Sequence, residues 1–243
     1  MLHAAKIDHG AAIGVGSRVR CREMMNDSDP HLPPLPSGHV HVWQFSLKVD
    51  RFALEACESI LSTDERQRAE RYARPELRRR FVVARATLRK LLGAYGGRPA
   101  DRLRFAYGPA GKPELCENDG GGGGWNFNVS HSSDWTLIAV SPGGVGGSAV
   151  GVDLEKVQPL DYEAIGRGVL GESDMAALNQ APASVKADVF FRLWVRHEAR
   201  AKALGVGLGT CVDVPVYDLD VGPEYRAALA TAIPGVRIEL FSR

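Results

Sequence analysis

Two acidic residues near the middle of the chain have the spacing of a cation site. The segment Val150-Gly-Val-Asp-Leu-Glu155 alternates as a half-buried strand does, so Asp153 and Glu155 project to one face. Two carboxylates about 4 Å apart repel by roughly 4 kcal/mol at an effective dielectric near 20. A shared proton, a nearby Arg or Lys, or a divalent cation such as Mg²⁺ would relieve that repulsion. A solvated surface strand has the same pattern, so the pair alone does not decide between them.

A second set of polar residues lies on a helix that the sequence predicts over residues 190–202. Trp194, Glu198 and Lys202 follow one another at intervals of four, which places them on adjoining turns of one side. Acidic and basic residues in this order also stabilise an ordinary helix. The spacing therefore fits both a functional helix and a purely structural one.

The chain also contains a strongly basic stretch. Residues 65–90 hold ten Lys and Arg against three Glu, a local charge of +7 in a protein whose net charge is +1. Such a block attracts phosphates or other polyanions, although a solvated arginine-rich helix has the same composition. Binding of single-stranded nucleic acid would need aromatic side chains among the basic ones. Only Tyr72 and Phe81 lie there, so we expect no nucleic-acid partner.

The elements that must position these residues begin with a strand at Val40–Phe45, where apolar and polar residues alternate. His39 and His41 have no third ligand nearby, and we interpret them as strand-surface residues. The segment Ser62–Glu65 has the spacing of a capping box that begins a helix. A further helix follows Pro75, with four arginines on the sides away from its apolar residues: Arg78, Arg79, Arg85 and Arg89.

Glycine- and proline-rich stretches divide the chain into three parts. We interpret residues 1–38 as an irregular N-terminal extension, 39–147 as an N-terminal α+β half, and 148–243 as a C-terminal α+β half with the metal site. In the last part we expect helices near 162–170, 173–178 and 184–204, and strands at 214–219 and 225–230. Strands and helices mix without regular alternation, so the predicted fold class is α+β.

The composition of the chain is that of a folded soluble protein. The 243 residues are 44% hydrophobic and 24% charged, as in folded soluble proteins. No apolar run approaches the roughly 20 residues that cross a bilayer, and no secretory signal is recognisable. The cysteines are scattered, without a C-x-x-C pair. We therefore expect a cytoplasmic protein with free thiols and no membrane contact.

Several segments together resemble one family, the 4′-phosphopantetheinyl transferases of the surfactin-synthetase-activating type. The resemblance runs from about Val40 to Ala230 in the family's order. Its motifs are Gly111-Lys-Pro113, Phe127-Asn-Val-Ser-His-Ser132, Gly151-Val-Asp-Leu-Glu-Lys156, Trp194-x-x-x-Glu-Ala-x-x-Lys202 and Gly205-x-Gly-Leu208. This resemblance implies a monomeric pseudodimer of two similar α+β halves, with coenzyme A bound in the active site between them.

The resemblance also implies roles for individual residues. Mg²⁺ would be held by Asp153, Glu155 and Glu198. Lys202 would contact the coenzyme A diphosphate. The 3′-phosphate would be bound by Arg68, Arg80, Ser130 and His131, and the adenine would be lined by Lys112 and Pro113.

The implied reaction is transfer of 4′-phosphopantetheine from coenzyme A to a serine of an apo acyl or peptidyl carrier protein, releasing 3′,5′-ADP. Glu198 would act as the base, and Lys202 would add positive charge at the diphosphate. His197 stands where the family usually has lysine, and it has either a catalytic role dependent on its charge or a packing role. Two alternatives remain: a non-catalytic relative that binds coenzyme A or a carrier protein, and an unrelated metal-dependent hydrolase.

Overall fold

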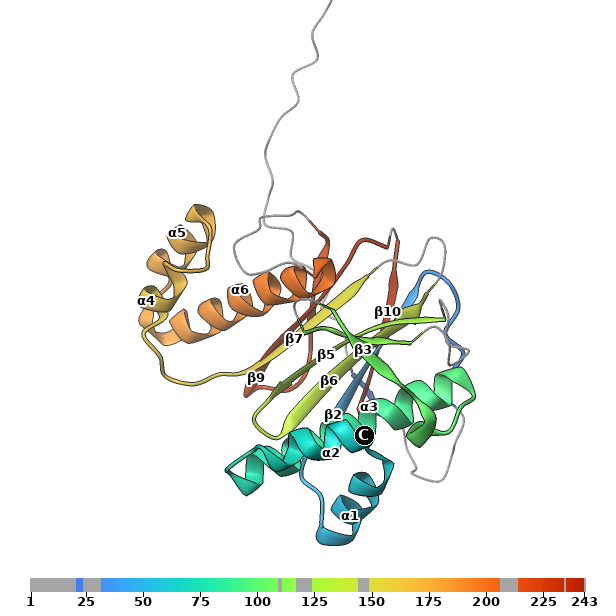
Figure 1. The fold of residues 1–243 in the computed structure, drawn as a ribbon. Helices are drawn as coiled ribbons and strands as arrows, with labels where there is room; N and C mark the ends of the chain where they lie inside the picture. The colour runs from blue at the N-terminus through green and yellow to red at the C-terminus, as the bar shows by residue number, and fades with distance from the viewer. Residues whose placement is uncertain are drawn as a thin grey trace, which may run out of the picture.

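The computed structural model describes residues 21–23, 32–108, 111–116, 124–143, 149–205, 214–233 and 235–242. The glycine runs at 120–123 and 144–148 and the segment 206–213 therefore lie outside the described residues. The described chain forms four layers, with α3 on one side, two stacked sheets in the middle and α6 on the other side (Figure 1). This mixed arrangement confirms the predicted α+β class.

The first sheet has the strand order β1-β10-β2-β6-β5. Its strands are β1 (Cys21–Glu23), β10 (Arg237–Ser242), β2 (His39–Ser46), β6 (Trp135–Pro142) and β5 (Trp125–Ser132). A separate hairpin is formed by β3 (Phe105–Tyr107) and β4 (Pro113–Leu115). The last strand, β10, pairs in parallel with β2, so the end of the chain completes a sheet otherwise built from the first half. The short strand β1 lies within residues 1–38, the segment expected to be irregular, and it pairs in parallel with β10.

The second sheet has the order β7-β9-β8, with β7 (Val150–Lys156), β9 (Tyr225–Thr231) and β8 (Val216–Leu219). Val152 and Leu154 of β7 are fully buried, as the alternation predicts, and they face the first sheet. The opposite face of this sheet packs on α6 (Ala183–Leu204) through Ala228 and Ala230. The helices α4 (Tyr162–Gly166) and α5 (Glu172–Gln180) flank α6 (Figure 1).

Gly151 sets the distance between α6 and β7. A Cβ atom at this position would lie 2.1 Å from the carbonyl oxygen of Ala199 and 2.3 Å from the nitrogen of Ala203. Any side chain would therefore push the helix away from the strand. The close packing brings the polar residues of α6 over the acidic face of β7.

The first sheet is covered by α3 (Pro75–Gly96), preceded by α1 (Arg51–Ile60) and α2 (Thr63–Glu70) and followed by the short helix η1 (Ala100–Arg102). The capping box of α2 is confirmed, because the Glu65 carboxylate accepts from the Ser62 N–H at 3.0 Å. The prediction that Arg85 and Arg89 lie on polar sides of α3 is wrong. They are 9% and 1% exposed, because both pair with the buried Glu65.

The interpretation of His41 as a surface residue is also wrong. Both faces of β2 are covered, and the His41 ring is fully buried. Its Nδ1 atom lies 2.8 Å from the hydroxyl of Tyr95, to which Trp43 Nε1 also donates at 2.8 Å. Burial lowers the pKa of His41 to about 4.

Candidate active site

The centre of the site is the carboxylate of Asp153, which is 2% exposed. Its Oδ1 atom lies 2.5 Å from the ammonium of Lys202 on α6 and accepts from the Ser130 hydroxyl on β5 at 2.9 Å. Lys202 Nζ also lies 3.3 Å from Ser130 Oγ. The structure thus brings together three residues that the resemblance assigned to one site, and they come from both sheets and from α6.

The carboxylates of Glu155 and Glu198 both interact electrostatically with Asp153. Burial raises the pKa of Glu155, and the neighbouring charges of Asp153 and Glu198 raise it further, while bonding from Ser132 and the charge of Lys202 oppose this. Burial and then the charge of Asp153 likewise raise the pKa of Glu198. Three carboxylates therefore share one neighbourhood, and Lys202 supplies positive charge to all of them.

These residues fit a hard divalent cation. The Oδ2 atom of Asp153 is buried and has no hydrogen-bond partner among the described residues. An unpaired oxygen of a buried carboxylate is costly, and a cation would compensate it. Carboxylate oxygens are also the ligands that Mg²⁺ prefers. Within the described part of the chain, however, no three acidic, histidine or cysteine side chains are already gathered at metal-binding distances. The Asp153 carboxylate is paired with the ammonium of Lys202.

A cavity of about 290 Å³ lies beside this acidic set. Its walls combine aromatic rings with basic groups and the turn after β3: Arg68, Tyr72, Phe81, Ala84, Arg85, Leu88, Tyr107, Gly111, Pro113, Val129 and His131. The guanidinium of Arg68 lies 5.3 Å from the ring centre of Phe81. Apolar walls and a few basic groups suit a planar ring that carries phosphate. Arg68, Pro113 and His131 are thus gathered as the resemblance implies.

Strand β5 connects the cavity to the acidic set. Val129 and His131 line the cavity, while the alternate residues Ser130 and Ser132 bond to the carboxylates of β7. The imidazole of His131 is exposed to the cavity but surrounded by protein. Desolvation lowers its pKa, and the positive charges of Lys202 and Arg80 lower it further. Both parts of the site therefore lie within electrostatic reach of each other.

Two other candidate residues lie at the edge of this site. The ammonium of Lys112 donates to the backbone carbonyl of Lys202 at 3.2 Å, and desolvation lowers its pKa. This hydrogen bond connects the turn between β3 and β4 to the C-terminal end of α6. Arg80 Nε donates to Asp134 Oδ1 at 2.9 Å, next to Arg79 at 3.2 Å. Arg80 is therefore held by an ion pair in the hairpin between β5 and β6.

Comparison with known proteins identifies the family. Residues 46–143 match the family model described as 4′-phosphopantetheinyl transferase, N-terminal, and residues 149–234 match that of the 4′-phosphopantetheinyl transferase superfamily. The 4′-phosphopantetheinyl transferase HetI of Nostoc is 33% identical over 207 residues, which cover 85% of this chain and 84% of HetI. The chain belongs to the 4′-phosphopantetheinyl transferase superfamily.

More distant members of the superfamily match shorter segments. The 4′-phosphopantetheinyl transferase psf-1 of Bacillus pumilus is 28% identical over 158 residues, 65% of this chain and 64% of psf-1. The L-aminoadipate-semialdehyde dehydrogenase-phosphopantetheinyl transferase of Homo sapiens is 24% identical over 179 residues, 68% of this chain and 57% of that protein. These relatives support an enzyme of this type over the non-catalytic alternative.

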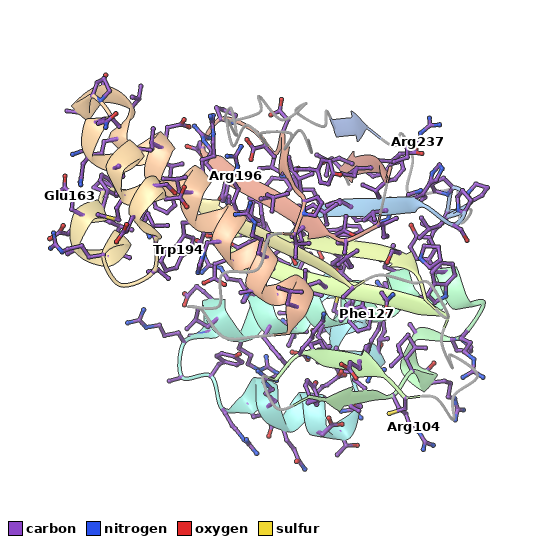
Figure 2. The ribbon with its side chains drawn as sticks, turned by 90° about the horizontal axis from the view of Figure 1, so that it is seen from above. Arg104, Phe127, Glu163, Trp194, Arg196 and Arg237 are labelled. Atoms are coloured by element: carbon purple, nitrogen blue, oxygen red, sulfur yellow. The ribbon has the colours of Figure 1, made fainter. Side chains whose placement is uncertain are left out.

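Two further residues of α6, Trp194 and His197, were singled out by the sequence. Trp194 (Figure 2) contacts two apolar clusters. One joins α6 to the second sheet, and the other is the aromatic cluster between α4 and α6, in which Trp194 packs on Phe190. It therefore anchors α6 and does not reach the acidic set by any contact found in the described residues. His197 Nε2 is buried and has no hydrogen-bond partner in the same described part of the chain. The structure leaves both interpretations of His197 open.

Some residues in and beside the site could have been assigned a role from the sequence but were not. Ser132 bonds to Glu155 and Asn128 bonds to the backbone of β7, although neither was assigned a role. Their spacing with Ser130, at every second position of a strand, was the available signal. Arg85 and Tyr107 of the cavity wall bond to each other at 3.0 Å, and no local pattern predicts that contact.

Proposed function

We propose that this transferase moves 4′-phosphopantetheine from coenzyme A to a serine of an apo acyl or peptidyl carrier protein and releases 3′,5′-ADP. We also propose that it depends on Mg²⁺ and is of the surfactin-synthetase-activating type. The observation that carries this proposal is the contact of Lys202 with Asp153 and Ser130. This contact supports the proposal because it joins the acidic residues of β7 and α6 to β5, the strand whose Val129 and His131 line the cavity.

Coenzyme A would bind with its adenine against the aromatic wall of the cavity, near Pro113 and Lys112. Its 3′-phosphate would meet Arg68 and His131, with Arg80 close by. Burial, Lys202 and Arg80 lower the pKa of His131, which favours the neutral imidazole, and its ring N–H would donate to the phosphate. Ser130 is 5% exposed and already engaged with Asp153, so in this account it contributes to the acidic set rather than to the phosphate.

Asp153, Glu155 and Glu198 would hold Mg²⁺, which supplies positive charge at the diphosphate when bound. In the same step Lys202 would turn from Asp153 to the departing phosphate and add a fixed positive charge there. The carrier serine oxygen forms the new P–O bond, and the P–O bond to 3′,5′-ADP breaks. Glu198 would take the serine proton, and its raised pKa makes it a better base near neutral pH.

His197 directly precedes this proposed base in α6. Its unpaired Nε2 suits either a phosphate contact or a packed position. We further propose a cytoplasmic monomer that binds neither membrane nor nucleic acid. In support, no helix among the described residues is both long and apolar enough to cross a bilayer. Much of the basic stretch is also occupied internally, because Arg78, Arg79, Arg80, Arg85 and Arg89 all pair with acids.

The proposal is tested by incubating the protein with coenzyme A, Mg²⁺ and a panel of apo acyl and peptidyl carrier proteins, followed by intact-mass analysis of the carriers. We expect at least one carrier to gain the mass of a phosphopantetheine arm. A carrier whose acceptor serine is replaced by alanine is the matched control and should gain nothing. No mass gain on any carrier, or equal gain on the alanine control, would overturn the proposal.

A further inference from the structure

A row of polar side chains on β5 joins the two sheets. At every second position a side-chain oxygen accepts a hydrogen bond from a backbone N–H of β7. Asn128 Oδ1 lies 2.9 Å from the nitrogen of Val152, Ser130 Oγ 3.3 Å from that of Leu154, and Ser132 Oγ 3.0 Å from that of Lys156. These three side chains, which we call the polar seam, take the place that backbone carbonyls have in an ordinary strand ladder.

The two serines of the polar seam make a second bond, to a carboxylate, for which Asn128 has no counterpart among the residues that the structure describes. Ser130 Oγ donates to Asp153 at 2.9 Å, and Ser132 Oγ donates to Glu155 Oε2 at 2.9 Å. A hydroxyl has one hydrogen and two lone pairs, so it can accept from an N–H while donating to a carboxylate. Because the N–H can only donate, each hydroxyl hydrogen is directed at its carboxylate.

The pattern on β7 explains why Asn128 differs. Each serine bonds the N–H of one residue and the carboxylate of the residue before it. The residue before Val152 is Gly151, which has no side chain and lies against α6. Asn128 therefore holds the backbone of β7 without touching an acid, and it serves as an internal comparison for Ser132.

We propose that Ser132 and Ser130 are positioning residues of this transferase, which orient the carboxylates of Glu155 and Asp153 toward the bound cation. This inference rests on the proposed function, since it assigns the carboxylates to a cation. Ser132 gives the cleaner test, because Ser130 also contacts Lys202. Groups that orient metal ligands in this way typically change metal affinity by about 10- to 100-fold when removed.

The test measures Mn²⁺ binding to the full chain without coenzyme A, by the electron paramagnetic resonance signal of free Mn²⁺. Ser132→Ala should weaken binding about tenfold, because the Glu155 carboxylate loses its restraint. Ser132→Thr keeps the hydroxyl and should restore affinity to within about twofold of the starting protein. Asn128→Ala, the matched control, should lower the melting temperature about as much as Ser132→Ala but leave Mn²⁺ affinity within about threefold.

Equal weakening by Ser132→Ala and Asn128→Ala would show that the polar seam is only structural and would overturn the inference, as would failure of Ser132→Thr to restore binding. Absence of Mn²⁺ binding to the unmodified protein would overturn it as well. The carrier-mass assay separates these outcomes from the proposed function. Transfer by the unmodified protein, together with identical behaviour of the two alanine variants, rejects the positioning role and leaves the function standing.

Discussion

Each half contains a charge cluster around a buried carboxylate, Glu65 in the first half and Asp153 in the second, and the two clusters are built in opposite ways. In the first half one carboxylate, Glu65, meets two guanidiniums, at 2.6 Å from Arg89 and 3.5 Å from Arg85. In the second half three carboxylates share the single ammonium of Lys202. The first cluster has excess positive charge and the second has excess negative charge.

The clusters also differ at their central carboxylate, although Arg85 Nη1 in the first cluster is itself buried without a hydrogen-bond partner among the described residues. Both Glu65 oxygens have partners, and Arg89 Nη1 donates to two backbone carbonyls at 2.9 Å, those of Ala100 and Leu103. One oxygen of Asp153, in contrast, has no partner in the described part of the chain. We call the Glu65 cluster closed, because both oxygens of its carboxylate have partners, and the Asp153 cluster open, because one oxygen has none among the described residues. A closed cluster stabilises the fold, whereas an open one is suited to bind a ligand. The comparison therefore assigns structure to the Glu65 cluster and chemistry to the Asp153 cluster.

The largest expected effect is on transfer by the open cluster. Asp153→Asn keeps the size of the side chain but removes the charge that would bind the cation. We expect the rate of carrier modification to fall about 10³-fold, measured by intact mass over time. Asp188→Asn, in the same half and paired with Arg226, is the control and should change the rate less than about twofold. A comparable loss in both variants would contradict a special role for Asp153.

The closed cluster should instead respond in stability. Glu65→Gln leaves two buried guanidiniums without their counter-charge, and we expect the free energy of unfolding to fall by about 3 kcal/mol. Urea denaturation measures this value. Glu55→Gln removes an exposed partner of Arg51 and should cost at most about 0.5 kcal/mol. If Glu65→Gln costs no more than Glu55→Gln, the first cluster does not stabilise the fold.

His41 lies outside both clusters and gives a pH reference for stability measurements. Its pKa is about 4 in the folded protein, beside Tyr95, His39 and Glu239, against 6.5 for an ordinary histidine. As the pH falls, His41 is therefore protonated in the unfolded chain before it is protonated in the folded protein. The stability associated with the neutral, buried imidazole is fully present above pH 6.5 and is lost as the pH falls toward 4. Between pH 7.5 and pH 5 the loss amounts to about 2 kcal/mol.

The measurement is urea denaturation of the unmodified protein and of His41→Gln at both pH values. The variant should lose about 2 kcal/mol less than the unmodified protein on going to pH 5. A parallel loss in both proteins would show that other groups cause the acid sensitivity.

The smallest expected effect concerns the ammonium in the open cluster. Lys202→Met removes the group that competes with a cation for Asp153, so Mn²⁺ affinity without coenzyme A should rise about fivefold, or about 1 kcal/mol. Carrier modification should fall in the same variant, because the charge at the diphosphate is lost. Lys90→Met, an exposed lysine of α3, should change neither quantity. Weaker Mn²⁺ binding to Lys202→Met would contradict competition between the lysine and the cation.

The local parts of this structure follow from the sequence. The alternation in β7 predicts that Val152 and Leu154 are buried, and both are. The spacing along 190–202 predicts a helix, and the helix expected at 184–204 is observed at Ala183–Leu204. These predictions succeed because they depend only on residues near one another in the chain. The family motifs added the α+β pseudodimer and the enzyme class, which local periodicity does not reveal.

The parts that the sequence did not predict depend on distant contacts. Arginine on a helix suggests a solvated side, yet Arg89 is buried because Glu65 lies on a different helix directly opposite it. The parallel pairing of β10 with β2 joins strands that lie almost two hundred residues apart by their register, and no pattern within either strand specifies it. The sequence allowed a nearby Arg or Lys beside Asp153 as one alternative, but for the same reason it did not single out Lys202 for a direct ion pair. The individual roles of the candidate residues stay predictions until they are tested.

The most direct test of the open and closed clusters is calorimetric titration of the full-length protein with Mn²⁺. We expect one Mn²⁺ bound per chain in the unmodified protein, loss of that binding in Asp153→Asn, and retention of it in Glu65→Gln at a temperature where that variant is folded. Undiminished binding to Asp153→Asn, or no binding to the unmodified protein, would contradict it.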